Sequence, residues 1–245
     1  MPALRIGLIG VGLIVFWQTV VWVTQVPPYI LPPPISVAEA MVANGPELLR
    51  HGGVTLIEIL AGLIIGTVFG ACSALLLLIS RGIKYWLMPV LVISQAIPVF
   101  ALAPLLVLWL GYGLASKIAM AVLIIFFPIT ATFYDGLRRT EAQWVALARV
   151  MDAPSRAVLF QIRIPAALPT LASGLRVATA VAPIGAVVGE WVGSSAGLGY
   201  YMLHANARMQ IDTMFAALAV LTVMALVLYY AMDVGLQRLV FWPSD

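Results

Sequence analysis

Few residues in this sequence could do chemistry. Two carboxylates, Glu58 and Glu190, stand in or beside long apolar stretches, where a charge is costly and suggests a proton relay or a solute contact. The alternative, which we favour, puts Glu58 at the entry to one stretch and Glu190 at the exit of another, near a polar boundary. His51 and His204 have no second ligand at metal-binding spacing, so the sequence predicts no metal site.

Other catalytic patterns are missing from the sequence. Cys72 is the single cysteine, which excludes an internal disulfide, and its apolar surroundings predict a core position. The glycine-rich run 193–199 lacks the lysine and the strand of a phosphate-binding loop and instead predicts a tight turn or a short re-entrant piece. Without a nucleophile beside a base, or paired carboxylates, we expect a protein that is not an enzyme and binds no cofactor.

Composition indicates a membrane protein. Hydrophobic residues make up 63% of the 245 residues and charged residues 9%, whereas a soluble domain carries about 45–50% and about 25% respectively. In a membrane chain the net charge of +3 mainly reports orientation. Because no basic cluster is interleaved with aromatic residues, the sequence predicts lipid rather than nucleic acid as its surroundings.

Six apolar stretches are long enough to cross a bilayer, which takes about 20 helical residues. They cover residues about 6–24, 54–79, 86–110, 118–134, 169–188 and 213–232. The first is expected to be a retained helix rather than a signal peptide, because no small-residue cleavage site precedes Pro27. The sequence thus predicts an all-α polytopic membrane protein with a single domain over residues 1–245.

Lysine and arginine are divided unequally between the expected loops. With the N-terminus in the cytoplasm, the residues that fall outside are Arg50, Lys117 and Arg208. Those that fall inside are Arg5, Arg81, Lys84, Arg138, Arg139, Arg149, Arg156, Arg163, Arg176 and Arg238. Since cytoplasmic loops carry the excess of positive charge, both termini are expected in the cytoplasm.

Three prolines interrupt the expected spans. Pro98 and Pro104 in the third span, and Pro183 in the fifth, break the hydrogen-bond ladder, and lipid cannot satisfy the freed backbone groups. These helices are therefore expected to line a central pathway, with simple kinks as the alternative. The expected lining residues are Gln95, Pro98, Pro104, Pro183 and Glu190.

Small residues recur in the second expected span. Gly62, Gly66 and Gly70 are four residues apart, so they share one helix face. This glycine stripe predicts close packing against a neighbouring helix.

The longest internal connection, about residues 138–165, predicts a helix-turn-helix. Thr140 and Gln143 have capping-box spacing, which predicts a helix start. The apolar stripe that follows is Trp144, Leu147, Ala148 and Met151. Asp152, which tolerates a left-handed backbone, and Pro154, which suits a helix start, then mark a break. The stripe must lie against lipid headgroups or a partner protein.

This connection resembles the cytoplasmic signature of the membrane permeases of binding-protein-dependent ABC importers. That signature reads E-A-A, three residues, G, nine residues, and I-x-L-P. The corresponding positions here are Ala146, Leu147, Ala148, Asp152, Ile162, Ile164 and Pro165. The match holds at Ala148, Ile162 and Pro165, whereas the glutamate, the middle alanine and the glycine of the signature are replaced.

The resemblance extends along the chain. Residues 31–34, 96–105 and 111–118 resemble the nitrate, taurine and alkanesulfonate branch of these permeases. Residues 189–200 and 204–208 are similar to permeases for thiamine-precursor pyrimidines and related heterocycles. The resemblance implies the type I ABC importer permease fold, in which six spans carry a cytoplasmic coupling helix between spans four and five.

The same resemblance implies a non-catalytic subunit of the bacterial inner membrane. Its partners would be a second copy of the chain, a cytoplasmic ATPase dimer that binds ATP, and an extracytoplasmic substrate-binding protein. The expected solute is a thiamine-precursor pyrimidine or related heterocycle, with sulfonate, taurine or nitrate as the alternative. The residues expected to contact the ATPase are Trp144, Leu147, Ala148, Arg149, Met151, Asp152, Ala153, Pro154, Arg156, Ile162 and Pro165.

Two rivals come from other functional classes. An ion-driven secondary carrier could use Glu58 or Glu190, but it would have two similar halves with broken helices at matched positions, and the sequence has no such repeat. An intramembrane enzyme would need a catalytic constellation, which the sequence lacks.

Overall fold

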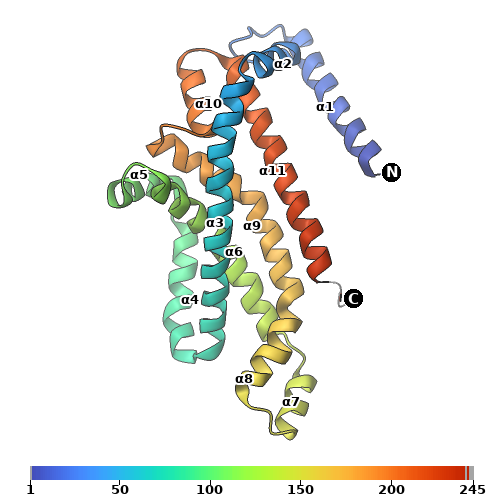
Figure 1. Ribbon diagram of the computed structural model, residues 1–245, viewed down its shortest axis with the longest axis vertical. Coiled ribbons are helices and arrows are strands. Elements are labelled where there is room, and N and C mark those ends of the chain that lie inside the picture. The colour runs from blue at the N-terminus through green and yellow to red at the C-terminus, as the bar shows by residue number, and fades with distance from the viewer. Residues whose placement is uncertain (1, 241, 243–245) are drawn as a thin grey trace. The chain divides into compact units, whose positions relative to one another are not determined.

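The computed structural model describes residues 2–240 and 242 as helices joined by short connections (Figure 1). The α-helices are α1 (Pro2–Thr24), α2 (Pro34–Ala43), α3 (Gly45–Ile79), α4 (Arg81–Ala96), α5 (Val99–Leu110), α6 (Leu114–Arg138), α7 (Ala142–Val150), α8 (Ser155–Ala157), α9 (Ile164–Gly193), α10 (Leu198–Ala207) and α11 (Ile211–Leu239). A π-helical turn, η1 (Val158–Arg163), joins α8 to α9. The described residues contain no strand, which confirms the all-α prediction. Met1, Phe241 and residues 243–245, included in the expected single domain, lie outside the described residues.

Five helical segments are long and apolar enough to cross a membrane. These are Gly7–Thr24 within α1, then α3, α6, the continuous segment Ser155–Gly193, and α11. A sixth candidate is the pair α4 and α5, which are bent by 104° relative to each other. The expected span over residues 86–110 is therefore divided into two helices, and whether the pair crosses the membrane as one span stays a prediction. Ile97 precedes a proline and is extended, with φ −78° and ψ 123°, and this ends α4.

The chain divides into two compact units. The first unit comprises Met1–Thr55 and Ser195–Val223, and the second comprises Leu56–Ser194 and Met224–Asp245. A single domain over the whole chain stays a prediction.

In the first unit, α3 starts earlier than the expected span. The helix begins at Gly45 rather than near residue 54 and continues through Gly52 and Gly53. Interior glycines cost a helix about 1 kcal/mol each relative to alanine, but they do not terminate it. A Cβ added at Gly52 would lie 4.0 Å from Leu198 and 3.9 Å from Val220, so this glycine faces its neighbours within the unit.

In the second unit, the glycine stripe of α3 packs against α6, as predicted. A Cβ added at Gly62 would lie 2.6 Å from the Ala121 Cβ, and one at Gly66 would lie 2.9 Å from Ile125. The buried core beside this contact contains Ile59, Leu63, Ala121, Ile125, Ile129, Ala178, Ala182 and Ala186. Cys72 is exposed, so its expected core position is wrong. Two residues beyond Gly70, it points away from the glycine face.

Helices α6 and α9 approach closely through glycines that the sequence reading did not single out. A Cβ added at Gly185 would lie 2.8 Å from the Ala121 Cα, and one at Gly189 would lie 3.2 Å from the Lys117 Cα. Pro183 lies inside α9, is buried, and does not end the helix. The core of the second unit is therefore built from α3, α6 and α9, which position both sites described below.

Candidate functional site

The helix after α6 forms where predicted, but not by the predicted cap. Helix α7 starts at Ala142 with Glu141 as its N-cap residue, and no side chain caps it. The Thr140 hydroxyl instead donates a hydrogen bond to the Leu137 carbonyl, 3.2 Å away. The capping-box prediction was therefore wrong. Thr140 lies beside the end of α6 and satisfies a carbonyl of the preceding helix rather than an amide of the following one.

Asp152 makes the predicted turn after α7. Its φ is +52°, in the left-handed region that few side chains tolerate. The Asp152 amide donates to the Arg149 carbonyl at 3.1 Å, and the Ala153 amide donates to the Ala148 carbonyl at 2.9 Å. Pro154 then precedes α8 with φ −63° and ψ 147°. Aspartate thus performs at this position the conformational task expected of the signature glycine.

A π-helical turn leads from α8 into α9. Pro165 and Pro169 have no amide proton, so each leaves a carbonyl four residues earlier without its usual donor. Residues 158–163 adopt the wider π geometry directly before the first of these prolines. The helical segment Ser155–Gly193 is nevertheless continuous, so the expected span over 169–188 is one part of a longer helix.

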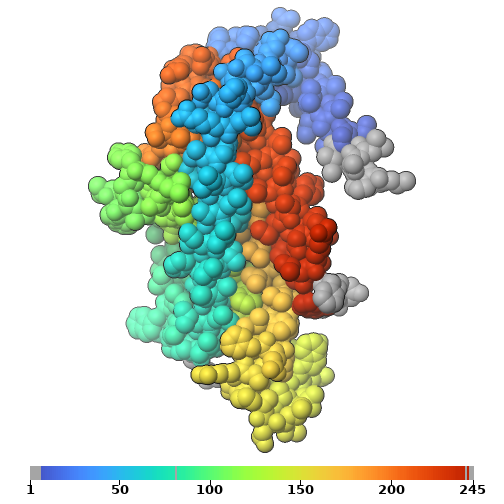
Figure 2. Space-filling view, viewed as in Figure 1, coloured from blue at the N-terminus to red at the C-terminus, as the bar shows by residue number. Residues whose placement is uncertain are grey.

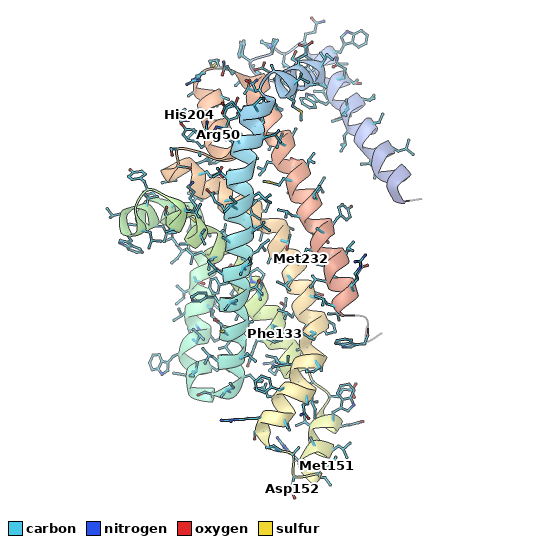
Figure 3. The ribbon with its side chains drawn as sticks, viewed as in Figure 1. Arg50, Phe133, Met151, Asp152, His204 and Met232 are labelled. Carbon is cyan, nitrogen blue, oxygen red and sulfur yellow. The ribbon has the colours of Figure 1, made fainter. Side chains whose placement is uncertain are left out.

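The apolar side chains of α7 remain largely uncovered. Trp144 is 50% exposed, Leu147 61% and Met151 73%. They border a groove of about 390 Å³ whose lining is Trp144, Leu147, Ala148, Met151, Gln161, Ile162, Pro165, Ala166 and Trp242. Met151 and Asp152 lie at the tip of this segment (Figure 3). In the space-filling view the segment projects past the turn between α3 and α4 (Figure 2).

The residues expected to contact an ATPase fall on several surfaces of this segment. Ala148 is a buried residue of α7, whereas Arg149, Asp152, Pro154 and Arg156 are exposed. Ala153 is half-buried, and Ile162 and Pro165 lie across the groove from the stripe. The structure thus brings the predicted set together as one projecting segment of the second unit.

The five residues expected to line a pathway do not gather at one place. Gln95, Pro98 and Pro104 are exposed on α4, α5 and the bend between them. Pro183 and Glu190 are buried in α9. No single surface of the described chain therefore contains all five residues.

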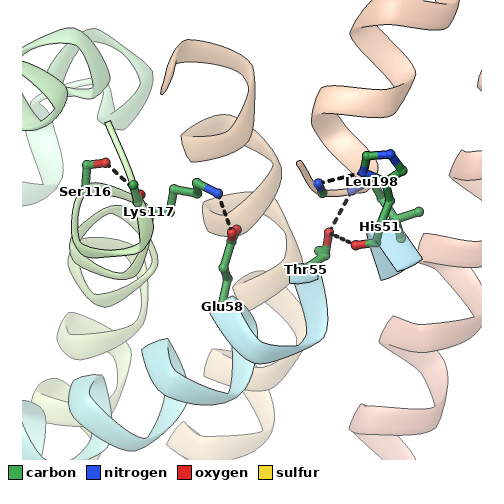
Figure 4. Close-up of polar contacts among 8 residues, drawn as sticks. His51, Thr55, Glu58, Ser116, Lys117 and Leu198 are labelled. Carbon is green, nitrogen blue, oxygen red and sulfur yellow. Dashed lines mark hydrogen bonds and ion pairs between the residues drawn. The ribbon is translucent and has the colours of Figure 1, made fainter. Parts of the chain in front are cut away.

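A buried charged cluster in the second unit joins three of the spans. Lys117 of α6 donates to Glu58 of α3, with 2.7 Å between Nζ and Oε1 (Figure 4). Glu190 of α9 is within hydrogen-bonding reach of Glu58. The exposed fractions are 0% for Glu58, 5% for Lys117 and 1% for Glu190. Both carboxylates are enclosed by protein, and their position near a polar boundary of the membrane stays a prediction.

Lys117 is the residue of this cluster that the sequence reading missed. The expected fourth span starts at 118, which assigned Lys117 to an outside loop, whereas α6 begins at Leu114 and includes it. Lys117 could have been identified from the tendency of a charged residue in or beside a span to pair with a residue of opposite charge. Glu58 is such a partner, but it lies 59 residues earlier.

His51 has a local structural role in the first unit. Its Nδ1 accepts a hydrogen bond from the Gly197 amide at 3.0 Å, and the neighbouring Thr55 hydroxyl accepts one from the Leu198 amide at 2.8 Å (Figure 4). The His51 ring stacks on Tyr201, with 4.9 Å between centroids. Burial, reinforced by the Glu47 carboxylate, raises the pKa of the Tyr201 hydroxyl, so this ring stays neutral. These contacts attach the glycine-rich turn to α3.

Comparison with known proteins gives a consistent result. Residues 59–241 match the family described as the binding-protein-dependent transport system inner membrane component. The sequence is 56% identical to a probable ABC transporter permease protein of Haemophilus influenzae, over 98% of this chain and 96% of that protein. It is 38% identical to the formylaminopyrimidine transport permease protein ThiX of Halalkalibacterium halodurans, over 81% of this chain and 80% of the relative.

The fold is similar to that of a solved membrane transporter. A chain from the crystal structure of an amino acid ABC transporter with histidines superposes with a TM-score of 0.68. The match covers 81% of this chain and 96% of that one at 16% sequence identity. At this identity the likeness supports the fold alone.

Proposed function

Because the chain belongs to the family of binding-protein-dependent transport system inner membrane components, we propose that this ABC importer permease carries a thiamine-precursor pyrimidine or a related heterocycle. The relative that transports formylaminopyrimidine supports this choice. Residues 189–200 and 204–208, which prompted the same expectation, include the turn held by His51 and Thr55. Sulfonate, taurine or nitrate is the alternative solute, favoured by residues 96–105 and 111–118.

The proposed energy source is a separate ATPase dimer that docks on α7. The observation that carries this proposal is the exposure of Trp144 and Leu147 on α7, and of Met151 directly after it, in a segment that projects from the second unit. Exposed apolar side chains of this size mark protein or lipid contacts. The turn at Asp152 and the groove behind the stripe favour a protein partner, since together they form a shaped surface. The permease itself would bind no nucleotide or other cofactor.

The complete importer would contain further partners. A second copy of the chain would complete the pathway, and Gln95, Pro98 and Pro104 would face it or the transported solute. A substrate-binding protein would dock on the extracytoplasmic side. The chain would lie in a bacterial inner membrane with both termini and α7 on the cytoplasmic side. In this orientation the distribution of arginine and lysine follows the positive-inside rule.

The ATPase contact can be tested by co-purification with the candidate ATPase. The variant Trp144→Glu with Leu147→Glu places two carboxylates in the apolar stripe and is expected to abolish the complex at unchanged membrane expression. The matched control, Trp144→Phe with Leu147→Met, keeps the stripe apolar and should retain the ATPase. Retained binding and uptake in the glutamate variant would contradict the assignment and place the ATPase contact on another surface of the chain.

The solute can be tested separately in proteoliposomes that contain the permease and its ATPase. The measurement is ATP hydrolysis stimulated by the cognate binding protein loaded with formylaminopyrimidine or with taurine. Stimulation by the pyrimidine alone is expected. Stimulation by taurine alone would assign taurine as the solute in place of the pyrimidine, without affecting the proposal for the ATPase contact.

A further inference from the structure

A second cavity lies on the side of α7 away from the apolar stripe. Its volume is about 480 Å³. The lining comprises Leu78, Ile79, Val145, Arg149, Ala153, Ser155, Arg156, Val158, Leu159 and Arg163. Three arginines therefore border one space, and no carboxylate is among the lining residues. We call this space the arginine cavity.

The three arginines have no partner of opposite charge in the described part of the chain. The ion pairs of other cytoplasmic-side arginines, Arg139 with Asp135 and Arg176 with Asp233, involve none of them. Three guanidinium groups around one cavity repel one another, screened in part by water at the exposed Arg149 and Arg156, and a bound anion would remove the remaining repulsion. Arginine is the side chain best suited to phosphate, because its planar fork can donate two hydrogen bonds at once.

Apart from Ser155, the remaining wall of the arginine cavity is apolar. Leu78 and Ile79 end α3, a helix long and apolar enough to span the membrane, and Val158 and Leu159 belong to the π-helical turn. Phe160, within that turn, is 63% exposed. The cavity therefore lies at the end of a span and combines positive charge with hydrocarbon, a combination that suits an amphiphile better than a soluble ion.

We propose that the arginine cavity binds the phosphate headgroup of an anionic phospholipid. The part of an acyl chain nearest the headgroup would lie against Leu78, Ile79 and Leu159. Basic pockets between membrane helices on the cytoplasmic side are suited to such headgroups. The acidic surface of an ATPase is a weaker candidate occupant. The apolar stripe proposed to meet the ATPase borders the other groove, whereas Val145 and Arg149 face this cavity.

The test measures lipid bound to the full-length chain in detergent by native mass spectrometry. Equimolar phosphatidylglycerol and phosphatidylcholine are offered as probes. The wild-type chain is expected to retain phosphatidylglycerol preferentially. The variant Arg149→Gln, Arg156→Gln, Arg163→Gln should bind it roughly 100-fold more weakly, since each basic residue near a membrane surface contributes a factor of about five. The control Arg138→Gln, Arg139→Gln, Arg238→Gln removes equal charge outside the cavity and should bind as wild type does.

Two further comparisons separate the occupants. Three competitors are compared for displacing bound phosphatidylglycerol: inorganic phosphate, soluble glycerol phosphate and a second anionic lipid. If all three are equally effective, the apolar wall contributes nothing to binding and the lipid assignment is overturned. If the cavity variant loses the ATPase while lipid binding is unchanged, the arginines belong to the ATPase contact and the proposal fails. Because Arg149 and Arg156 are also among the residues expected to contact the ATPase, the deciding variant is Arg163→Gln alone, which lies outside that set. Loss of the preference for phosphatidylglycerol in this variant, with the ATPase retained, supports the proposal.

The proposal does not depend on the folding of the triple variant. Absence of a preference for phosphatidylglycerol in the wild-type chain would overturn it without any substitution. The charge-retaining variant Arg149→Lys, Arg156→Lys, Arg163→Lys should keep part of the preference. The variant Trp144→Glu with Leu147→Glu should keep all of it while losing the ATPase, so the lipid site and the proposed ATPase contact can fail independently.

Discussion

Lys117 Nζ lies 2.7 Å from Glu58 Oε1, and both side chains are buried between α3, α6 and α9. Glu190 is the third member of this cluster. The Lys117 ammonium group is thus paired with the Glu58 carboxyl group, and Glu190 is buried beside Glu58. Since a buried charge without a partner is far more costly than a paired one, the three spans depend on one another through this contact.

The variant Lys117→Met is expected to lower stability by about 3–5 kcal/mol, because it leaves buried carboxylates without a cation. The measurement is the midpoint of thermal unfolding in detergent. The double variant Lys117→Met with Glu58→Leu should be less destabilised than Lys117→Met alone, because one of the stranded carboxylates is also removed. An unchanged midpoint for Lys117→Met would show that the pair contributes nothing to stability.

The variant Gly70→Ala is expected to destabilise the contact between α3 and α6. Its Cβ would lie 2.9 Å from the Ile129 Cβ and 2.9 Å from the Phe126 carbonyl oxygen, and a backbone atom cannot move aside without shifting the helix. Overpacking of this kind costs about 1–3 kcal/mol. The control is Gly53→Ala, where no atom lies within 4 Å, so helix propensity alone should make it neutral or stabilising. Thermal unfolding of both variants checks the difference, and equal midpoints would contradict it.

The variant Asp152→Val is expected to lose coupling between ATP hydrolysis and uptake. A β-branched residue resists the φ of +52° at this turn, with a cost of about 1–2 kcal/mol. Asp152→Gly should transport as well as the wild type, because glycine adopts this conformation freely. The ratio of solute moved to ATP hydrolysed in proteoliposomes is the measurement. A normal ratio for the valine variant would show that this backbone conformation is not required.

The variant His51→Phe is expected to loosen the glycine-rich turn in the first unit. The ring can still stack on Tyr201, but the Gly197 amide loses its acceptor, and an unsatisfied buried amide costs about 1–3 kcal/mol. Hydrogen exchange at Gly197 should accelerate. The neighbouring His204→Phe serves as the control, since His204 accepts no bond from this turn. Equal exchange in the two variants would remove the proposed role of His51.

Local patterns in the sequence predicted the parts of the structure that depend on neighbouring residues. The glycine stripe of α3 is set by helical periodicity, and the left-handed Asp152 by the conformational preference of its side chain. The apolar stripe of α7 followed the same logic. The all-α fold followed from composition, because a chain this apolar must satisfy its backbone within helices.

Features that depend on distant residues were missed. The start of a span was placed after Lys117 because hydropathy treats a lysine as an end signal, although burial beside Glu58 makes it an interior residue. Thr140 matched a capping pattern, yet its hydroxyl donates to the Leu137 carbonyl at the end of α6 and accepts from no amide of α7. Pro98 was predicted to interrupt the helix. A hydropathy pattern gives no information on the angle between helices, so it could not distinguish a kink from the 104° bend.

The helical segment Ser155–Gly193 also has a mechanical consequence. It contains 39 residues and, at 1.5 Å per residue, extends over about 58 Å. One end adjoins the turn at Asp152, and Glu190 lies near the other. A rod of this kind can convey a tilt or an axial push along its own backbone, without any intervening side chain as a relay. The π-helical turn next to Pro165 is a compliant joint in this rod, as are Pro169 and Pro183, because a loosened hydrogen-bond ladder allows rotation about the axis. These positions limit how much of a displacement at the Asp152 end reaches the carboxylates.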